Sequence, residues 1–308
     1  MISIVTPLYN KGDRFAETLQ SALRQSFAEF ELLVVNDGST DGGEQIARAC
    51  NDPRVRVIDQ PNAGVAAARN TGIRAARFPL IAFLDADDLW DPDYLACQMS
   101  LVQEFPEAAV FGCAYRRVSR SIHVPKPVFP VPEGFRGLIT EPWGSKGCAM
   151  LWTSALVVKK EALEAVGLFD PRIAYGEDLD LWFRLLLRYK AAFQNKVLAS
   201  YIHDAAQKTA DVTARIFTRY YPCYIDKFAE ARRDNADFRR YYDRGCLERL
   251  FPYYASHRQD NDTDRVLAQI NLDEHPASFR FRFRFPRIYC YYCRCIALGR
   301  AIWKRLTH

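Results

Sequence analysis

The chain lacks any run of 18 or so consecutive apolar residues, and its first residues lack the basic region and long apolar core of a signal peptide. Its nine cysteines are scattered without the spacing of a small disulfide scaffold, so we expect a reducing compartment. We find no repeat at a fixed period, which excludes a solenoid. These absences predict a cytoplasmic protein whose membrane contact, where it has one, is peripheral on the inner face of the cell membrane.

Acidic residues are missing from one end of the chain. Eight of the 42 Lys and Arg residues lie between Pro276 and His308, whereas all 37 Asp and Glu residues precede Pro276. The net charge of +5 is therefore the sum of a mildly acidic body and a basic tail. A hydrophobic content of 49% supplies a sizeable core and argues against disorder. We expect one large domain over residues 1–210, a helical region over 211–275 and a basic, aromatic tail over 276–308.

Short apolar runs alternate with helix-length segments through the first hundred residues. This alternation is typical of βαβ units and predicts a doubly wound parallel sheet. Ligands of such sheets bind beyond the carboxyl ends of the strands. The strands are expected at 2–6, 31–36, 55–58 and 80–84, and the helices at 14–25, 41–50 and 64–77, with starts at Asp13, at Ser39 or Thr40, and at Asn62.

From Pro106 the pattern loosens, and residues 125–142 hold five prolines. We expect an irregular loop there, which is a candidate for contact with an acceptor substrate. Regular structure is expected again later in the chain, as strands at 156–159 and 197–202 and as helices at 160–166, 177–189 and within 212–272.

Four carboxylates follow the predicted strands. Asp37 comes after the second strand, and Asp85, Asp87 and Asp88 come directly after the fourth. Gathered at one edge of a sheet they would repel one another, so a positive group is expected among them. A hard divalent cation, Mg²⁺ or Mn²⁺, accepts such oxygen ligands and keeps positions open for phosphate. Asp41, by contrast, is interpreted as a helix cap or turn residue.

Two helices carry further charged residues. Arg69 lies among small residues that let its helix approach the sheet, and its guanidinium can face a diphosphate. Glu177 and Asp178 begin a later amphipathic helix, where the helix dipole favours acids. The structural alternative for Arg69 is a solvated surface arginine. For Glu177 and Asp178 it is a helix N-terminus that acids stabilise.

Five motifs, in order, resemble the family 2 glycosyltransferases of the GT-A fold, over about residues 1 to 205. The resemblance implies an α/β, GT-A-type, doubly wound and mostly parallel sheet with a Rossmann-like nucleotide-binding half, followed here by a helical C-terminal extension. The motifs are Pro7-Leu8-Tyr9-Asn10, Val34 to Asp41, Asn62-Ala63-Gly64 with Ala68 to Gly72, Phe83 to Asp88, and Gly167 to Asp170 followed by Glu177-Asp178.

The resemblance also implies roles for individual residues. Pro7, Tyr9 and Asp37 match the pocket of the nucleobase, Arg69 lies near the nucleotide, and Asp85 matches the acid on the ribose side. Asp87, the second acid of a DXD motif, matches the metal ligand that bridges to the diphosphate. His203 falls where some members place a diphosphate or metal contact, in a poorly matching context. Asp178 matches the general base, with Glu177 beside it.

This set implies an inverting transfer of a sugar from a nucleoside diphosphate sugar, with UDP favoured, to a saccharide or lipid-linked acceptor of a cell-surface polysaccharide. An inverting enzyme needs a base near the acceptor hydroxyl, on the face of the sugar opposite the leaving group. A metal on Asp87 stabilises the charge of the leaving diphosphate. Two other classes stay open, namely a Mg²⁺-dependent nucleotidyltransferase acting on sugar phosphates and a non-catalytic nucleotide-sugar-binding protein.

The tail combines aromatic and basic residues. Phe and Arg alternate over residues 279–285, and apolar residues beyond Pro286 share one helical arc. An amphipathic segment of this kind predicts contact with an anionic membrane, and docking on the body is the alternative. Cys290, Cys293 and Cys295 lack a nearby fourth ligand for a closed zinc site. No nucleic-acid module accompanies the tail, so we expect no nucleic-acid partner.

Overall fold

The computed structural model describes residues 1–118, 123–126, 131–144, 151–202, 220–255, 261–286 and 288–291. The chain divides into two compact units, residues 1–212 and 213–308. Among the described residues, no helix combines the length and the hydropathy needed to cross a membrane.

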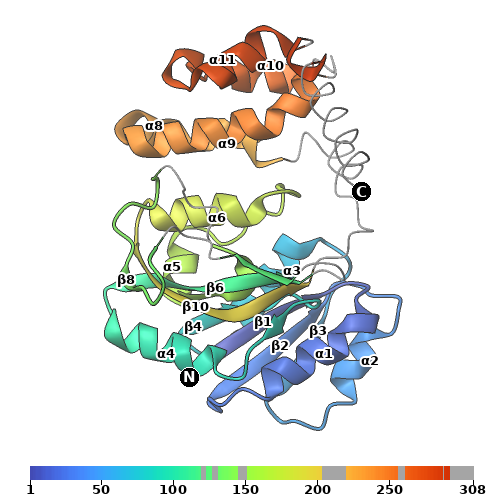
Figure 1. The fold of residues 1–308 in the computed structure, drawn as a ribbon. Coiled ribbons are helices and arrows are strands. Elements are labelled where there is room, and N and C mark those ends of the chain that lie inside the picture. The colour runs from blue at the N-terminus through green and yellow to red at the C-terminus, as the bar shows by residue number, and fades with distance from the viewer. Residues whose placement is uncertain are drawn as a thin grey trace, which may run out of the picture. The chain divides into compact units, whose positions relative to one another are not determined.

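The first unit is built on one mixed sheet with the strand order β3-β2-β1-β4-β9-β6-β10-β5, to which β7 and β8 add at β6 and β10 (Figure 1). Strands β1 to β4 are parallel, β9 is antiparallel to both β4 and β6, and β10 is parallel to β6. The sheet is therefore mostly parallel, as the sequence predicts. The strands are β1 (Ile2–Leu8), β2 (Phe30–Asn36), β3 (Val55–Asp59), β4 (Leu80–Phe83), β5 (Leu89–Trp90), β6 (Ala108–Val118), β7 (His123–Lys126), β8 (Arg136–Leu138), β9 (Leu156–Lys159) and β10 (Lys190–Ile202).

Helices cover both faces of this sheet (Figure 1). Phe15 and Leu19 of α1 pack with Ile4 of β1 in the core on one face. On the other face, Phe83 of β4 contacts Phe169 and Trp182 at ring-centroid distances of 5.5 and 6.3 Å. The helices are α1 (Gly12–Leu23), α2 (Gly43–Arg48), α3 (Val65–Ala75), α4 (Tyr94–Glu104), the 3₁₀ segment η1 (Thr153–Ala155), α5 (Lys160–Ala165) and α6 (Glu177–Leu186).

Helix α3 lies unusually close to the sheet. A Cβ atom at Gly72 would fall 2.4 Å from Val5 Cγ1 and 3.3 Å from Val35 Cγ2. Only a residue without a side chain fits between the helix and these two strands. This close approach brings Arg69, one turn earlier in α3, over the end of the sheet.

The second unit is helical. A buried ion pair between Arg232 Nε and Asp243 Oδ1, 2.7 Å long, joins two of its helices, and Phe238 and Tyr242 contribute to its aromatic core. Its described elements are η3 (Tyr221–Phe228), α8 (Ala229–Asp234), α9 (Ala236–Ala255), α10 (Asn261–Leu267), η4 (Leu272–Glu274) and α11 (Ala277–Arg284).

Several expected boundaries are wrong. The expected helix starts at Asp13, at Ser39 or Thr40, and at Asn62 are replaced by starts at Gly12, Gly43 and Val65. The loosened pattern after Pro106 hides an eleven-residue strand, β6, whose buried half is apolar without alternation. Strand β10 begins at Lys190 rather than at residue 197, and it does not close the sheet, because β5 lies beyond it.

Candidate active site

The loops after β1 and β2 are bonded to each other at the carboxyl edge of the sheet. The Thr40 N–H donates to Asn10 Oδ1 at 2.9 Å, and the Gly12 and Gly43 N–H groups donate to the Asp41 carboxylate at 2.8 and 3.0 Å. These hydrogen bonds, with Gly12 the largest influence, hold the pKa of Asp41 below its ordinary value. Asp41 is thus a structural residue that fixes the two loops, as its interpretation from the sequence has it.

Asp37 is only 3% exposed and anchors the turn before α3. Its carboxylate accepts hydrogen bonds from Gln60 Nε2 at 2.7 Å and from the Ala63 and Gly64 N–H groups, both at 2.9 Å. Asp37 therefore fixes the backbone of this turn, and its match to the nucleobase pocket stays a prediction. Two other residues of that pocket lie at the end of β1, where Pro7 is half-buried and Tyr9 is 48% exposed.

Arg69 is the buried cation that the acidic edge requires. Its side chain is 5% exposed, its Nη2 donates to Asp85 Oδ1 at 2.8 Å, and its Nη1 donates to Glu177 Oε1 at 2.9 Å. The guanidinium also lies 5.2 Å from the centre of the Phe169 ring. Arg69 thus connects the acids that follow β4 to the acids that begin α6, and it is not the solvated arginine of the structural alternative.

The first turn of α6 holds three acids in different surroundings. Burial, together with the negative charge of Asp178, raises the pKa of Glu177 to about 7, although Arg69 acts in the opposite direction. Asp180 is fully buried and pairs with Arg184 Nη2 at 2.7 Å, so it has a structural role. Asp178 is half-buried, and its Oδ1 accepts the Leu179 N–H at 2.7 Å.

The three acids after β4 also differ. Asp85 pairs with Arg69, and Asp87 Oδ2 accepts from Lys11 Nζ at 2.7 Å, with the Asp87 side chain 22% exposed. Asp88 is buried and accepts from Ser154 Oγ at 2.7 Å and from the Ile202 N–H at 3.2 Å. Burial, followed by the charges of Asp85 and Asp87, raises the pKa of Asp88 well above its ordinary value. Asp88 is therefore structural, whereas the side chains of Asp85 and Asp87 are 26% and 22% exposed.

Lys11 was missed by the sequence reasoning. It follows β1 by three positions, and inspection of every residue beyond a strand end, basic ones included, would have found it. In the part of the chain that the structure describes, no three His, Cys, Asp or Glu side chains gather as a ready metal site. His203 lies outside the described residues.

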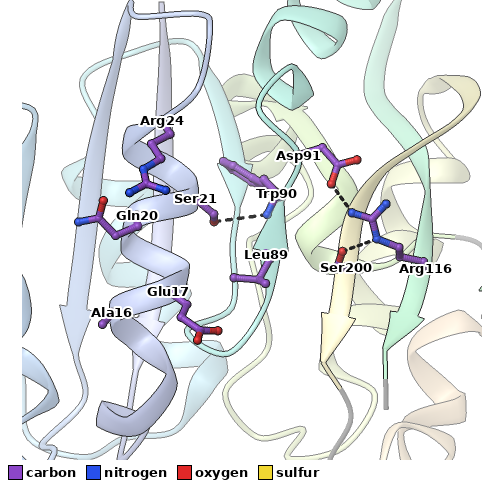
Figure 2. Close-up of a pocket in the computed structure, with 10 residues that line it drawn as sticks. All are labelled: Ala16, Glu17, Gln20, Ser21, Arg24, Leu89, Trp90, Asp91, Arg116 and Ser200. Carbon is purple, nitrogen blue, oxygen red and sulfur yellow. Dashed lines mark hydrogen bonds and ion pairs between the residues drawn. The ribbon is translucent and has the colours of Figure 1, made fainter. Parts of the chain in front are cut away.

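A separate open cavity of about 510 Å³ lies along α1 beside β5 (Figure 2). Arg116, one of its two basic residues, bonds to Asp91 and, at 2.8 Å, to Ser200 Oγ, while the Trp90 backbone N–H donates to Ser21 Oγ at 3.3 Å. None of the predicted site residues lines this cavity. Its lining residues are Ala16, Glu17, Gln20, Ser21, Arg24, Leu89, Trp90, Asp91, Arg116 and Ser200.

The mostly parallel sheet with helices on both faces has the GT-A architecture, and its carboxyl edge gathers acids around a buried arginine. Residues 3–167 match the family described as Glycosyl transferase family 2. This match spans more than half of the chain, so the protein belongs to this family.

Relatives and solved structures agree with this assignment. An uncharacterized glycosyltransferase of Rickettsia typhi is 31% identical over 222 residues, and the match spans 67% of this chain but only 65% of that protein. The Bacillus subtilis glycosyltransferase TuaG, whose name assigns it to teichuronic acid biosynthesis, is 28% identical over 211 residues, which are 65% of this chain and 78% of TuaG. The crystal structure of S. aureus TarS 1-349 in complex with UDP has a TM-score of 0.60 at 19% identity, covering 89% of this chain and 76% of that chain, and it shows the same fold.

Proposed function

We propose that this glycosyltransferase moves a sugar from a UDP-sugar to a saccharide or lipid-linked acceptor, with inversion at the transferred carbon. The observation that carries the proposal is the Arg69 bridge. It holds Asp85, at the end of β4, and Glu177, at the start of α6, on one guanidinium. The bridge supports one site for the acid matched to the ribose side, Asp85, and the acid matched to the general base, Asp178, which adjoins Glu177.

The donor is proposed to lie across the ends of β1, β2 and β4. Tyr9 offers an exposed ring to the nucleobase, and Asp37 fixes the turn beneath it. Arg69 and Lys11 supply positive charge for the diphosphate. The similarly folded TarS has been crystallised with UDP and with UDP-GlcNAc, which supports UDP as the nucleotide.

Mg²⁺ or Mn²⁺ is proposed to bind at Asp87. The Asp87 carboxylate is partly exposed and, within the described part of the chain, pairs with Lys11, so its oxygen chemistry fits a hard cation. Such ions are commonly held by one or two carboxylates together with the phosphates of the substrate, so a complete set of protein ligands is not required. When bound, the ion supplies positive charge to the leaving diphosphate.

Asp178 is proposed as the general base. Its half-buried carboxylate lies in the first turn of α6, beside the Arg69–Glu177 pair. Glu177 is paired with Arg69, so we assign the role of base to Asp178, the acid that matches it in the resemblance. A base on the face opposite the leaving group gives inversion.

The acceptor is proposed to belong to a cell-surface polysaccharide, which the name of TuaG supports. The chain spans less than two thirds of the Rickettsia typhi relative, so this proposal concerns the activity of the described site. Assay of a panel of nucleotide sugars with Mn²⁺ and read-out of UDP release tests the donor. Pyrophosphate release would instead support a nucleotidyltransferase, and release of neither product would support a binding protein.

The second unit is proposed to contact an anionic membrane through α11 and the residues after it. The Phe and Arg alternation of the sequence lies on a helix, so Phe279 and Phe283 are buried while Phe281 and Phe285 are each 43% exposed. Arg280 and Arg284 accompany the exposed rings, and this combination attracts anionic lipid.

Flotation on phosphatidylcholine vesicles with and without phosphatidylglycerol tests this contact. The full chain should bind only the anionic vesicles, and the double variant Phe281→Ser, Phe285→Ser should lose binding. The control is Val65→Ser, which removes an exposed apolar side chain from the first unit. Equal flotation of the double variant and the wild type would favour docking on the body.

A further inference from the structure

Three aromatic side chains from separate parts of the chain form a continuous cluster in the first unit. The ring centres of Tyr115 and Trp152 are 4.6 Å apart, and those of Trp152 and Tyr201 are 5.3 Å apart. All three side chains are half-buried. The exposed Arg117 places its guanidinium 5.5 Å from the centre of the Tyr201 ring. We call these four residues the aromatic platform.

The sheet topology places the aromatic platform at the catalytic edge. Because β9 is antiparallel to both β4 and β6, strands β6 and β4 run in the same direction, and β10 is parallel to β6. Tyr115 and Tyr201 lie toward the carboxyl ends of β6 and β10. They therefore share the edge of the sheet with Asp85 and Asp87, but on the side of β4 away from β1 and β2.

Two links bind the aromatic platform to the acids. Ser154, two positions after Trp152, accepts the Asp85 N–H at 3.1 Å and donates to Asp88 at 2.7 Å. Negative charges of the site also act on the tyrosines. Burial is the main cause that raises the pKa of Tyr115 and of Tyr201, and Arg117 opposes the shift in both. The charges of Asp178 and Asp88 add smaller contributions at Tyr115, and those of Asp88, Asp87 and Asp85 add to the shift of Tyr201.

We propose that the aromatic platform binds a pyranose ring of the acceptor saccharide. The proposal rests on the proposed function, because it needs a donor on the β1–β2 side and a base at Asp178. An acceptor must then lie on the remaining side of β4, which is where the aromatic platform is.

The chemistry of the aromatic platform suits a pyranose ring. The negative face of an aromatic ring attracts the weakly positive C–H face of a pyranose. Binding pockets commonly combine such apolar walls with a few polar groups that fix orientation. Arg117 supplies hydrogen-bond donors at the rim, which can bond to a sugar hydroxyl or carboxylate.

Saturation-transfer NMR with methyl β-D-glucoside, its galactoside, N-acetylglucosaminide and glucuronide, in the presence of UDP and Mn²⁺, tests the proposal on the full chain. At least one glycoside should receive saturation from the wild type. Trp152→Leu should weaken its binding about tenfold or more, equal to about 1.4 kcal/mol. Trp152→Phe, which keeps a ring, should recover much of the loss.

The control is Phe105→Leu, which changes a half-buried aromatic residue before β6, at the opposite edge of the sheet. This variant should bind the glycoside as the wild type does. UDP binding by thermal shift should be equal in all variants, which separates this inference from the donor site. If the wild type binds UDP but no glycoside, or if Trp152→Leu and Phe105→Leu weaken the glycoside equally, the acceptor assignment is overturned. If UDP itself does not bind, it is the proposed function that fails.

Discussion

Lys11 Nζ lies 2.7 Å from Asp87 Oδ2, although 76 positions separate the two residues in the chain. The lysine follows β1 and the aspartate follows β4, and these two strands are neighbours in the sheet. The ion pair therefore connects the loops at the carboxyl ends of two adjacent strands. It places a positive charge at the acid for which we propose a divalent ion. The ion and the lysine are thus alternative or shared partners of one carboxylate.

Asp87→Ala should weaken UDP binding in the presence of Mn²⁺ by at least about tenfold, because even residues behind metal ligands often contribute that much to metal affinity. Metal-free UDP binding should change little. Calorimetric titration with and without Mn²⁺ measures both. Asp91→Ala is the control, since Asp91 pairs with Arg116 and not with Lys11 or Arg69. If Mn²⁺ strengthens UDP binding as much in Asp87→Ala as in the wild type, Asp87 is not a metal ligand.

Asp178→Asn should lower the turnover number by about 10²–10⁴, the usual contribution of general base catalysis. The affinity for UDP should stay nearly that of the wild type, because the substitution keeps size and polarity. Turnover by UDP release and binding by thermal shift measure the two effects. Asp170→Asn, at a pair with the exposed Arg172, is the control. Wild-type turnover in Asp178→Asn would show that the base is another residue.

Arg69→Met should destabilise the first unit by about 3–5 kcal/mol, because it leaves two acids without their buried cation. Denaturant unfolding measures the change. Arg172→Met removes a cation that is 70% exposed and should cost at most about 1 kcal/mol. Similar losses in both variants would mean that the Arg69 bridge does not hold the site together.

Glu177→Gln tests the raised pKa of Glu177. The folded state favours protonated Glu177, so its contribution to stability is complete below the unfolded pKa of about 4.3 and is lost as the pH rises through about 7. Gln resembles the protonated acid and does not titrate. The melting temperature of the variant should therefore rise relative to that of the wild type between pH 5 and pH 8. A constant difference over this range, or one of opposite sign, contradicts the shift.

Gly72→Ala should destabilise the first unit by about 1–3 kcal/mol, as overpacking of a close contact usually does. Its new methyl group would overlap Val5 Cγ1. Thermal unfolding measures the loss. Val5→Ala combined with Gly72→Ala should cost less than the sum of the two single changes, since the shortened valine makes room. If the stability losses of the two single variants were strictly additive, the strain in Gly72→Ala would not come from its contact with Val5.

The sequence predicts the first four strands and the place of the acids well, because apolar runs, small-residue helices and strand-end aspartates are local patterns. It predicts a positive partner for the acids from their mutual repulsion, but it cannot choose between a metal, Lys11 and Arg69. That choice depends on contacts such as Arg69 to Glu177, over 108 positions.

Helix starts were mispredicted for the same reason. The expected caps were neighbours in the chain, whereas the N–H groups before α3 bond to Asp37, 26 and 27 positions away. Strand β6 was missed because a strand buried on both faces shows no alternation. The buried and exposed faces of α11 were likewise not predicted, because alternation with a period of two is typical of a strand.

Ser154 is fully buried, and its hydroxyl accepts a hydrogen bond from the Asp85 N–H and donates one to Asp88 Oδ2. Alanine would remove both bonds and leave two buried polar groups without this partner. Among close relatives of this chain, position 154 should therefore vary far less than the surface around it. The hydroxyl group of Ser154 bonds the segment that carries Trp152 to the loop that carries Asp87. The proposed donor and acceptor sites therefore share one buried hydrogen-bonding residue.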